Sequence, residues 1–215
     1  MDSLFSPDSV LMRGLTRIAD VMILNVLFIV TSLPVVTLGA SLTALNFTAM
    51  RIATGRCNSV SGDYFRSFRQ NFRQATIVAL VLAFLAAVLF AWYVVVTNLA
   101  IDPLFELILL AIWYGLAFTY VMMAVFTFPY LASFEGTTRQ VLRNARLMSW
   151  KHTPTALAAL TLIGLAVLVT VFYPQATGYG LAWLLIGFGG IATANGFLFA
   201  RIFDRYIAAA AAAQQ

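Results

Sequence analysis

Long apolar runs, interrupted by prolines and short polar segments, divide the whole chain. A helix of about 20 apolar residues crosses a bilayer. Proline restricts the residue before it and fits the first turn of a helix, so Pro34, Pro103 and Pro174 mark turns between consecutive runs. The six runs that this pattern predicts as membrane helices cover residues 15–33, 35–53, 75–99, 104–131, 154–173 and 181–203.

The second run, residues 35–53, is weaker than the others because small and polar residues recur along it. Such residues suit a membrane only where they face other helices or water. Two interpretations remain open: close packing against neighbouring helices, or the lining of a cavity or groove. Three placements of this run stay open: it spans the membrane, re-enters it or lies at the interface. The candidate polar face consists of Thr37, Gly39, Ser41, Thr43 and Asn46.

The positions of the basic residues favour six spans. If all six runs cross, all 13 Lys and Arg residues fall on one side of the membrane, and the three proline-containing turns lie on the other. Because basic residues accumulate on the cytoplasmic side, we expect a multi-pass protein with both termini in the cytoplasm. If residues 35–53 do not cross, five spans remain, and Arg13 and Arg17 move outside with the N-terminus.

Two polar segments on this basic side share one design. Apolar and cationic residues alternate at helical spacing in residues 64–73 and again in residues 138–150. That pattern predicts two basic amphipathic helices in the headgroup layer. They serve either as interfacial anchors or as a docking surface for a cytoplasmic partner. The candidate basic face consists of Arg66, Arg69, Arg73, Arg139, Arg143 and Arg146.

Composition sets the fold class. The chain is 62% apolar and 10% charged, whereas soluble domains are typically about 45–50% apolar and about 25% charged. We therefore predict an all-α polytopic membrane protein, with residues 1–207 as a single integral domain and residues 208–215 as a low-complexity tail or cloning scar. The net charge of +5 then fits anionic lipid, and no nucleic-acid partner is expected.

The sequence offers no constellation for catalysis or cofactor binding. Cys57 and His152 are single representatives of their types, which argues against a disulfide framework or a His/Cys metal site. Lys151 is the only lysine and lies outside any phosphate-binding loop motif. We expect a protein without enzymatic activity, and we assign no catalytic, cofactor-binding or metal-binding residues.

Some polar residues and one proline fall inside the predicted helices. Asn25 and Asn195 are interpreted as donors or acceptors of interhelical hydrogen bonds. Asp20 lies one turn from Arg17, which predicts an interfacial ion pair. Pro129 is expected to kink or end the fourth helix, because proline removes a backbone donor.

Several motifs resemble one family. Residues 32–41 read S-L-P-V-V-T-L-G-A-S, and residues 68–75, 128–130 and 139–145 add F-R-Q-N-F-R-Q-A, F-P-Y and R-Q-V-L-R-N-A. These strings resemble the YesL-like family of bacterial integral membrane proteins, and the likeness extends over most of the chain.

The resemblance implies a place in the bacterial cell membrane and an association with carbohydrate uptake. We expect an accessory subunit whose helix 35–53 packs against permease subunits of an ABC-type importer. The alternative is a small self-contained transporter or channel, with that helix lining the path. The substrate, the partner's identity and the oligomeric state remain open.

Overall fold

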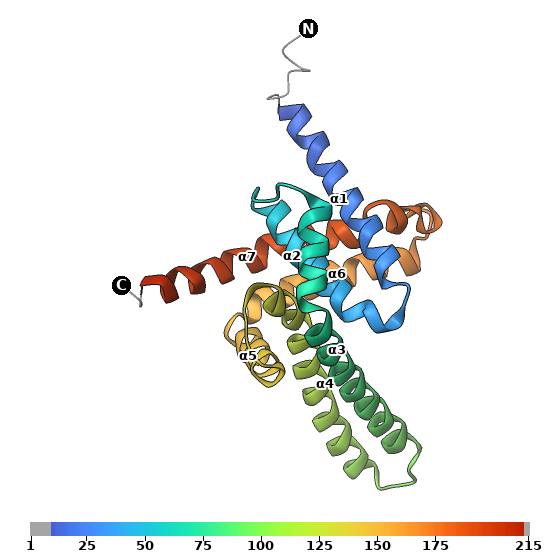
Figure 1. Cartoon of the computed structure of the whole chain (residues 1–215). Coiled ribbons are helices and arrows are strands. Elements are labelled where there is room, and N and C mark those ends of the chain that lie inside the picture. The colour runs from blue at the N-terminus through green and yellow to red at the C-terminus, as the bar shows by residue number, and fades with distance from the viewer. Residues whose placement is uncertain (1–9, 213–215) are drawn as a thin grey trace.

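The computed structural model describes residues 10–212, and this part of the chain is built from helices and the loops between them (Figure 1). Six of the helices are long and apolar enough to cross a membrane, so the predicted all-α polytopic fold is confirmed. The elements are α1 (Val10–Ser32), the 3-10 turn η1 (Val35–Thr37), α2 (Leu38–Ala53), α3 (Val60–Asn98), α4 (Pro103–Ser133), α5 (Thr138–Lys151), α6 (Thr153–Phe172), the 3-10 turn η2 (Gly178–Gly180), the π-helical segment η3 (Trp183–Gly187) and α7 (Phe188–Ala212).

Side-chain caps fix where three of the helices begin. The hydroxyl of Ser59 accepts from the backbone N–H of the third residue of α3, at 3.2 Å, and Asp102 accepts from the second residue of α4, at 2.9 Å. Thr137 and Gln140 form a reciprocal capping box at the start of α5. Each cap satisfies backbone donors that a helix start leaves without partners.

Helices α3 and α4 differ from the boundaries expected from the sequence. The basic stretch 64–73 is helical as predicted, but it forms the amino-terminal third of α3 rather than a separate helix, because no Gly or Pro separates it from the apolar run. The second basic stretch is the separate helix α5, as expected. Helix α4 passes through Pro129 and ends at Ser133, where the Ser133 hydroxyl donates to the Pro129 carbonyl at 3.0 Å.

Helix α2 lies at the centre of the fold. It packs against α1, α3, α4 and α7, and Figure 1 shows it enclosed where these helices meet. Ala40, Ala44 and Ala49 are fully buried. Small side chains let helix backbones approach closely, which suits association without large apolar residues. The weakest of the predicted spans is therefore the most enclosed helix of the molecule.

The contacts of α2 fix its position along α3. The Thr76 hydroxyl donates to the Val36 carbonyl at 3.3 Å, just before α2 begins, and at the other end Arg51 bonds Asp63 at 2.6 Å. Helix α2 therefore runs antiparallel to the basic third of α3. Its first turn also reaches the beginning of the apolar part of α3, where a Cβ at Gly39 would lie 2.8 Å from the Ala79 side chain.

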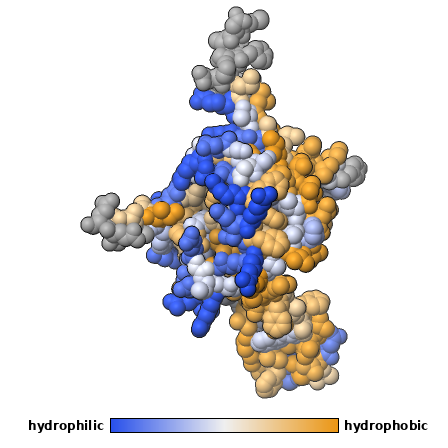
Figure 2. Space-filling model, in the orientation of Figure 1, coloured by the Kyte–Doolittle hydropathy of each residue, from blue (hydrophilic) through white to orange (hydrophobic). Residues whose placement is uncertain are grey.

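Beyond their contacts with α2, helices α3 and α4 project as a separate hairpin (Figure 1). The part of α3 after Thr76 extends for roughly 33 Å, enough for a hydrocarbon core of about 30 Å. Trp113 donates to the Leu89 carbonyl at 2.7 Å, and Tyr120 donates to the Leu82 carbonyl at 3.0 Å. The outer surface of the hairpin is hydrophobic (Figure 2), as expected for helices that face lipid.

Asn25 joins α1 to the π-helical segment before α7. Its amide nitrogen donates to the carbonyls of Trp183 at 3.0 Å and Leu184 at 2.7 Å, and its oxygen accepts from the Gly189 N–H at 2.9 Å. A π-helical turn leaves carbonyls without their usual partners, and this buried side chain satisfies two of them. The predicted interhelical role of Asn25 is confirmed.

Close approach of α2 and α3 at Gly39 gives a stability prediction. A Cβ added there would lie within 3 Å of the Ala75 backbone, whereas one added at Gly115 in α4 would meet nothing within 4 Å. We expect Gly39→Ala to destabilise the fold by about 1–3 kcal/mol through overpacking. Gly115→Ala, the control, should be neutral or stabilising by up to about 1 kcal/mol. Thermal unfolding in mild detergent measures both, and equal melting temperatures would contradict the packing described.

Candidate functional site

The candidate polar face of α2 turns towards the protein. Gly39, Ser41 and Thr43 are buried, while Thr37 and Asn46 are half-buried. Thr43 donates to the Gly39 carbonyl at 2.9 Å, and Asn46 donates to the carbonyl one turn before it at 2.8 Å. These bonds fit the packing interpretation of the face. Gly39 and Ser41 are enclosed by neighbouring helices of the same chain, which corrects the expectation that this surface is free to contact a permease helix.

Hydroxyl groups join the ends of three helices. The Ser41 hydroxyl donates to the Thr31 hydroxyl at 3.0 Å, and the Thr31 and Tyr64 hydroxyls lie 2.5 Å apart. Thr37 donates to the Thr31 carbonyl, also at 2.5 Å. Since Tyr64 is fully buried, its hydroxyl needs a partner, and this network supplies one. The network ties α1 and α2 to the start of α3.

Two buried polar atoms lack a hydrogen-bond partner among the described residues. They are the Thr48 hydroxyl oxygen and the Asn195 side-chain oxygen. Helices α2 and α7 approach closely here, because the position of a Cβ at Gly196 lies about 3.1 Å from the backbone of Ala49. The predicted hydrogen bond of Asn195 across the interface is therefore not made through this oxygen.

A charged cluster lies at the basic end of α2. The Asp63 carboxylate is nearly buried and accepts from Arg51 at 2.6 Å and from Arg66 at 2.7 Å. Both guanidinium carbons lie 5.7 Å from the ring centroid of Phe47. Cation–π attraction and the shared carboxylate hold the two cations together. The cluster positions the first arginine of the candidate basic face.

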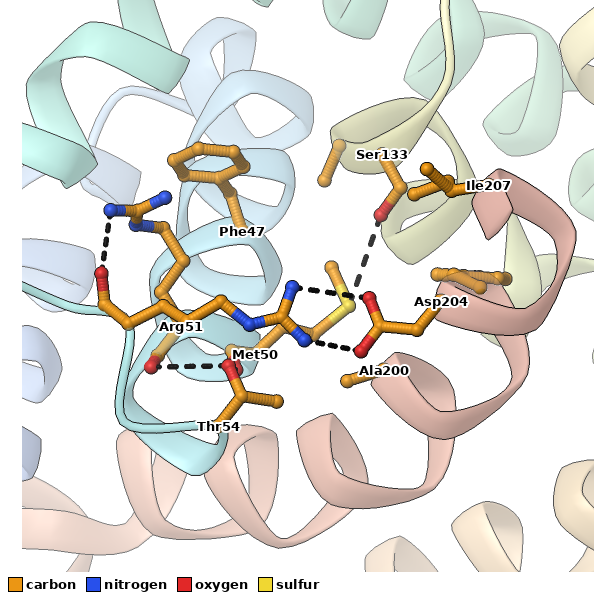
Figure 3. Close-up of a pocket in the computed structure, with 11 residues that line it drawn as sticks. Phe47, Met50, Arg51, Thr54, Ser133, Ala200, Asp204 and Ile207 are labelled. Atoms are coloured by element: carbon orange, nitrogen blue, oxygen red, sulfur yellow. Dashed lines mark hydrogen bonds and ion pairs between the residues drawn. The ribbon is translucent and has the colours of Figure 1, made fainter. Parts of the chain in front are cut away.

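A cavity of about 190 Å³ lies next to this cluster, between α2, α4 and α7 (Figure 3). Arg56 and Asp204 form a bidentate ion pair at its edge, and this pair raises the pKa of Arg56 through its hydrogen bond and charge. The Ser133 hydroxyl points at the Met50 sulfur, 3.9 Å away. Arg56 and Asp204 neutralise each other, and their ion pair acts as a latch that joins the α2–α3 loop to α7.

The linker between α5 and α6 is fixed to α7 in a similar way. His152 Nε2 lies 3.0 Å from the Tyr206 hydroxyl, and the Lys151 ammonium lies 5.1 Å from the Tyr206 ring centroid. Burial, together with the charges of Lys151 and Arg205, lowers the pKa of His152 below its ordinary 6.5. This shift favours the uncharged form of the imidazole.

All six arginines of the candidate basic face are exposed. The structure places them in two groups, one along the start of α3 and one along α5. Figure 2 shows hydrophilic side chains over the middle and left of the molecule and hydrophobic ones over the hairpin. The expected pair between Asp20 and Arg17 is absent from the ion pairs of the described residues, which all involve Asp63 or Asp204.

One family model matches part of the chain. Residues 21–93 match the model of a family described as "Protein of unknown function, DUF624". This stretch includes the second half of α1, all of α2 and most of α3, and so contains the α2–α3 contact and the Asp63 cluster. Comparison with curated proteins and with solved structures gives no match.

The Cys57 thiol leads to a reactivity prediction. Burial and the neighbouring Asp63 carboxylate raise its pKa from 9.0 to about 11, and the thiolate is the reactive form. At pH 7–8, we expect Cys57 to react with maleimide about 100-fold more slowly than an ordinary thiol. The exposed neighbour Asn58→Cys, in a Cys57→Ser background, is the matched control. Equal rates in permeabilised cells or mild detergent would contradict the local structure.

Proposed function

We propose that the protein is a non-enzymatic accessory subunit of a bacterial carbohydrate uptake system, and that it acts through its surface rather than through a passage of its own. The observation that carries this proposal is the contrast between its two sets of polar groups. On α2, Ser41, Thr43 and Asn46 are buried or half-buried and hydrogen-bonded, whereas the arginines of α3 and α5 are exposed.

The amino-terminal third of α3 is the surface we assign to a protein partner. Arg66 is held there by Asp63, while Arg69 and Arg73 are exposed on the same helix face. Three cations on one face of a helix suit an acidic surface on a partner, because complementary charge guides association and fixes orientation. A cytoplasmic face of permease subunits of an ABC-type importer would offer such a surface.

The carbohydrate assignment rests on the resemblance to YesL-like proteins. Two of the strings that carry this resemblance, residues 32–41 and 68–75, lie within the DUF624 match, and the other two, residues 128–130 and 139–145, lie outside it. The self-contained transporter remains the competing hypothesis. It requires the polar groups of α2 to face a path, and flux into liposomes that contain this chain alone tests it.

Uptake and co-purification test the accessory role. We expect deletion of the gene to reduce uptake of a labelled glycan fragment by intact cells. We expect Arg69→Glu/Arg73→Glu to lower the recovery of co-expressed permease subunits by about tenfold, because like charges at an interface cost several kcal/mol. The matched control is Arg139→Glu/Arg143→Glu, with the same charge change on α5.

Three results would contradict the proposal. The first is unchanged uptake after deletion, and the second is co-purification that survives reversal of the α3 charges. The third is substrate flux in liposomes without any importer, which would establish the self-contained transporter instead.

A further inference from the structure

A groove between α4 and α5 combines a cationic edge with an apolar floor. It has a volume of about 310 Å³ and is lined by Met123 and Leu142 together with three arginines. Arg139, Arg143 and Arg146 follow one another at helical spacing, so their side chains gather on one side of α5. Val141 and Ala145, on another face of α5, are buried in one core cluster with residues of α4, so the arginines stand on a helix that is packed in place.

The three guanidinium groups of this groove are not neutralised within the protein. Among the described residues, no carboxylate lies within ion-pair distance of them, and no hydrogen-bond partner is found for their side chains. Arg66, by contrast, shares Asp63 with Arg51. Clustered cations repel one another unless an anion lies between them. The groove is therefore complementary to a ligand with one or more negative charges.

Aromatic residues place the groove at the depth of lipid headgroups. Trp150, at the end of α5, is 50% exposed, and its ring lies 6.1 Å from the ring of Phe118 in an edge-to-face contact. Exposed Trp side chains concentrate at the boundary between hydrocarbon and water. On α4, Phe118 and Val121 continue the exposed apolar surface from the groove towards the hairpin. An acyl chain could follow this surface from a headgroup held at the arginines.

We propose that the groove binds an anionic phospholipid, with its phosphate groups between Arg139, Arg143 and Arg146 and its acyl chains against Met123, Leu142 and the outer face of α4. A basic pocket between helices on the cytoplasmic side is the kind of site that takes an acidic lipid headgroup. The apolar floor favours a lipid over free phosphate, which would gain nothing from Met123 and Leu142. This inference does not depend on the carbohydrate assignment.

Lipid binding to the purified full-length chain tests the proposal. The probes are tetraoleoyl-cardiolipin, dioleoyl-phosphatidylcholine and inorganic phosphate, each titrated in mild detergent, with bound lipid counted by native mass spectrometry. The test variant is Arg139→Gln/Arg143→Gln. The matched control is Arg69→Gln/Arg73→Gln, which removes the same charge from exposed positions on α3 that do not line the groove.

We expect the wild type to bind cardiolipin at least about tenfold more tightly than phosphatidylcholine. The α5 variant should lose at least about tenfold in cardiolipin affinity, and the α3 control should change by less than about threefold. Equal losses in both variants would show general attraction to charge and would overturn the proposal. Full competition by inorganic phosphate would also overturn it. If the α5 variant kept its cardiolipin affinity but lost co-purification with the importer, the groove would be assigned to a protein partner instead.

Discussion

The close approach of α2 to the basic third of α3 is the constraint on which the rest of the structure depends. Only a glycine at position 39 lets the two backbones meet, because the space for a Cβ is taken by Ala75. Once that contact is made, Thr76 reaches Val36 at one end and Asp63 reaches Arg51 at the other. The register of these two helices then sets where the apolar hairpin of α3 and α4 can project.

This register separates two kinds of surface. On one side, Ser41, Thr43 and Asn46 of α2 are buried or half-buried and hydrogen-bonded, as lipid or protein surroundings require. On the other, arginines of α3 and α5 remain exposed beside an apolar hairpin that is long enough for a bilayer. Since Arg73 precedes the contact residue Ala75 by half a turn of helix, most of α2 lies at the level of the cationic part of α3. The hairpin supplies apolar surface at another level.

Much of this architecture could be predicted from hydrophobic periodicity and helix caps. The six apolar runs correspond to the six helices that can span a membrane, and Asn25 forms the expected interhelical bonds. The junction in α3 could not be located, because a helix continues through a change from polar to apolar residues when nothing breaks it. The π-helical segment and the Arg56–Asp204 latch depend on contacts between residues far apart in sequence. In the sequence, the available signal for the ion pairs of Arg51, Arg66 and Arg56 was the position of two acidic residues, Asp63 and Asp204, close to several arginines.

Cross-linking of the α1–α2 turn to α3 tests the central register most directly. In a Cys57→Ser background, Val36→Cys/Thr76→Cys should be joined by a short thiol-reactive cross-linker in native membranes, because these residues are in contact. Val36→Cys/Asn98→Cys should not be joined, since position 98 lies roughly 33 Å further along α3. A link between positions 36 and 98, without one between 36 and 76, would place the α1–α2 turn beside the far end of α3 and contradict the structure described.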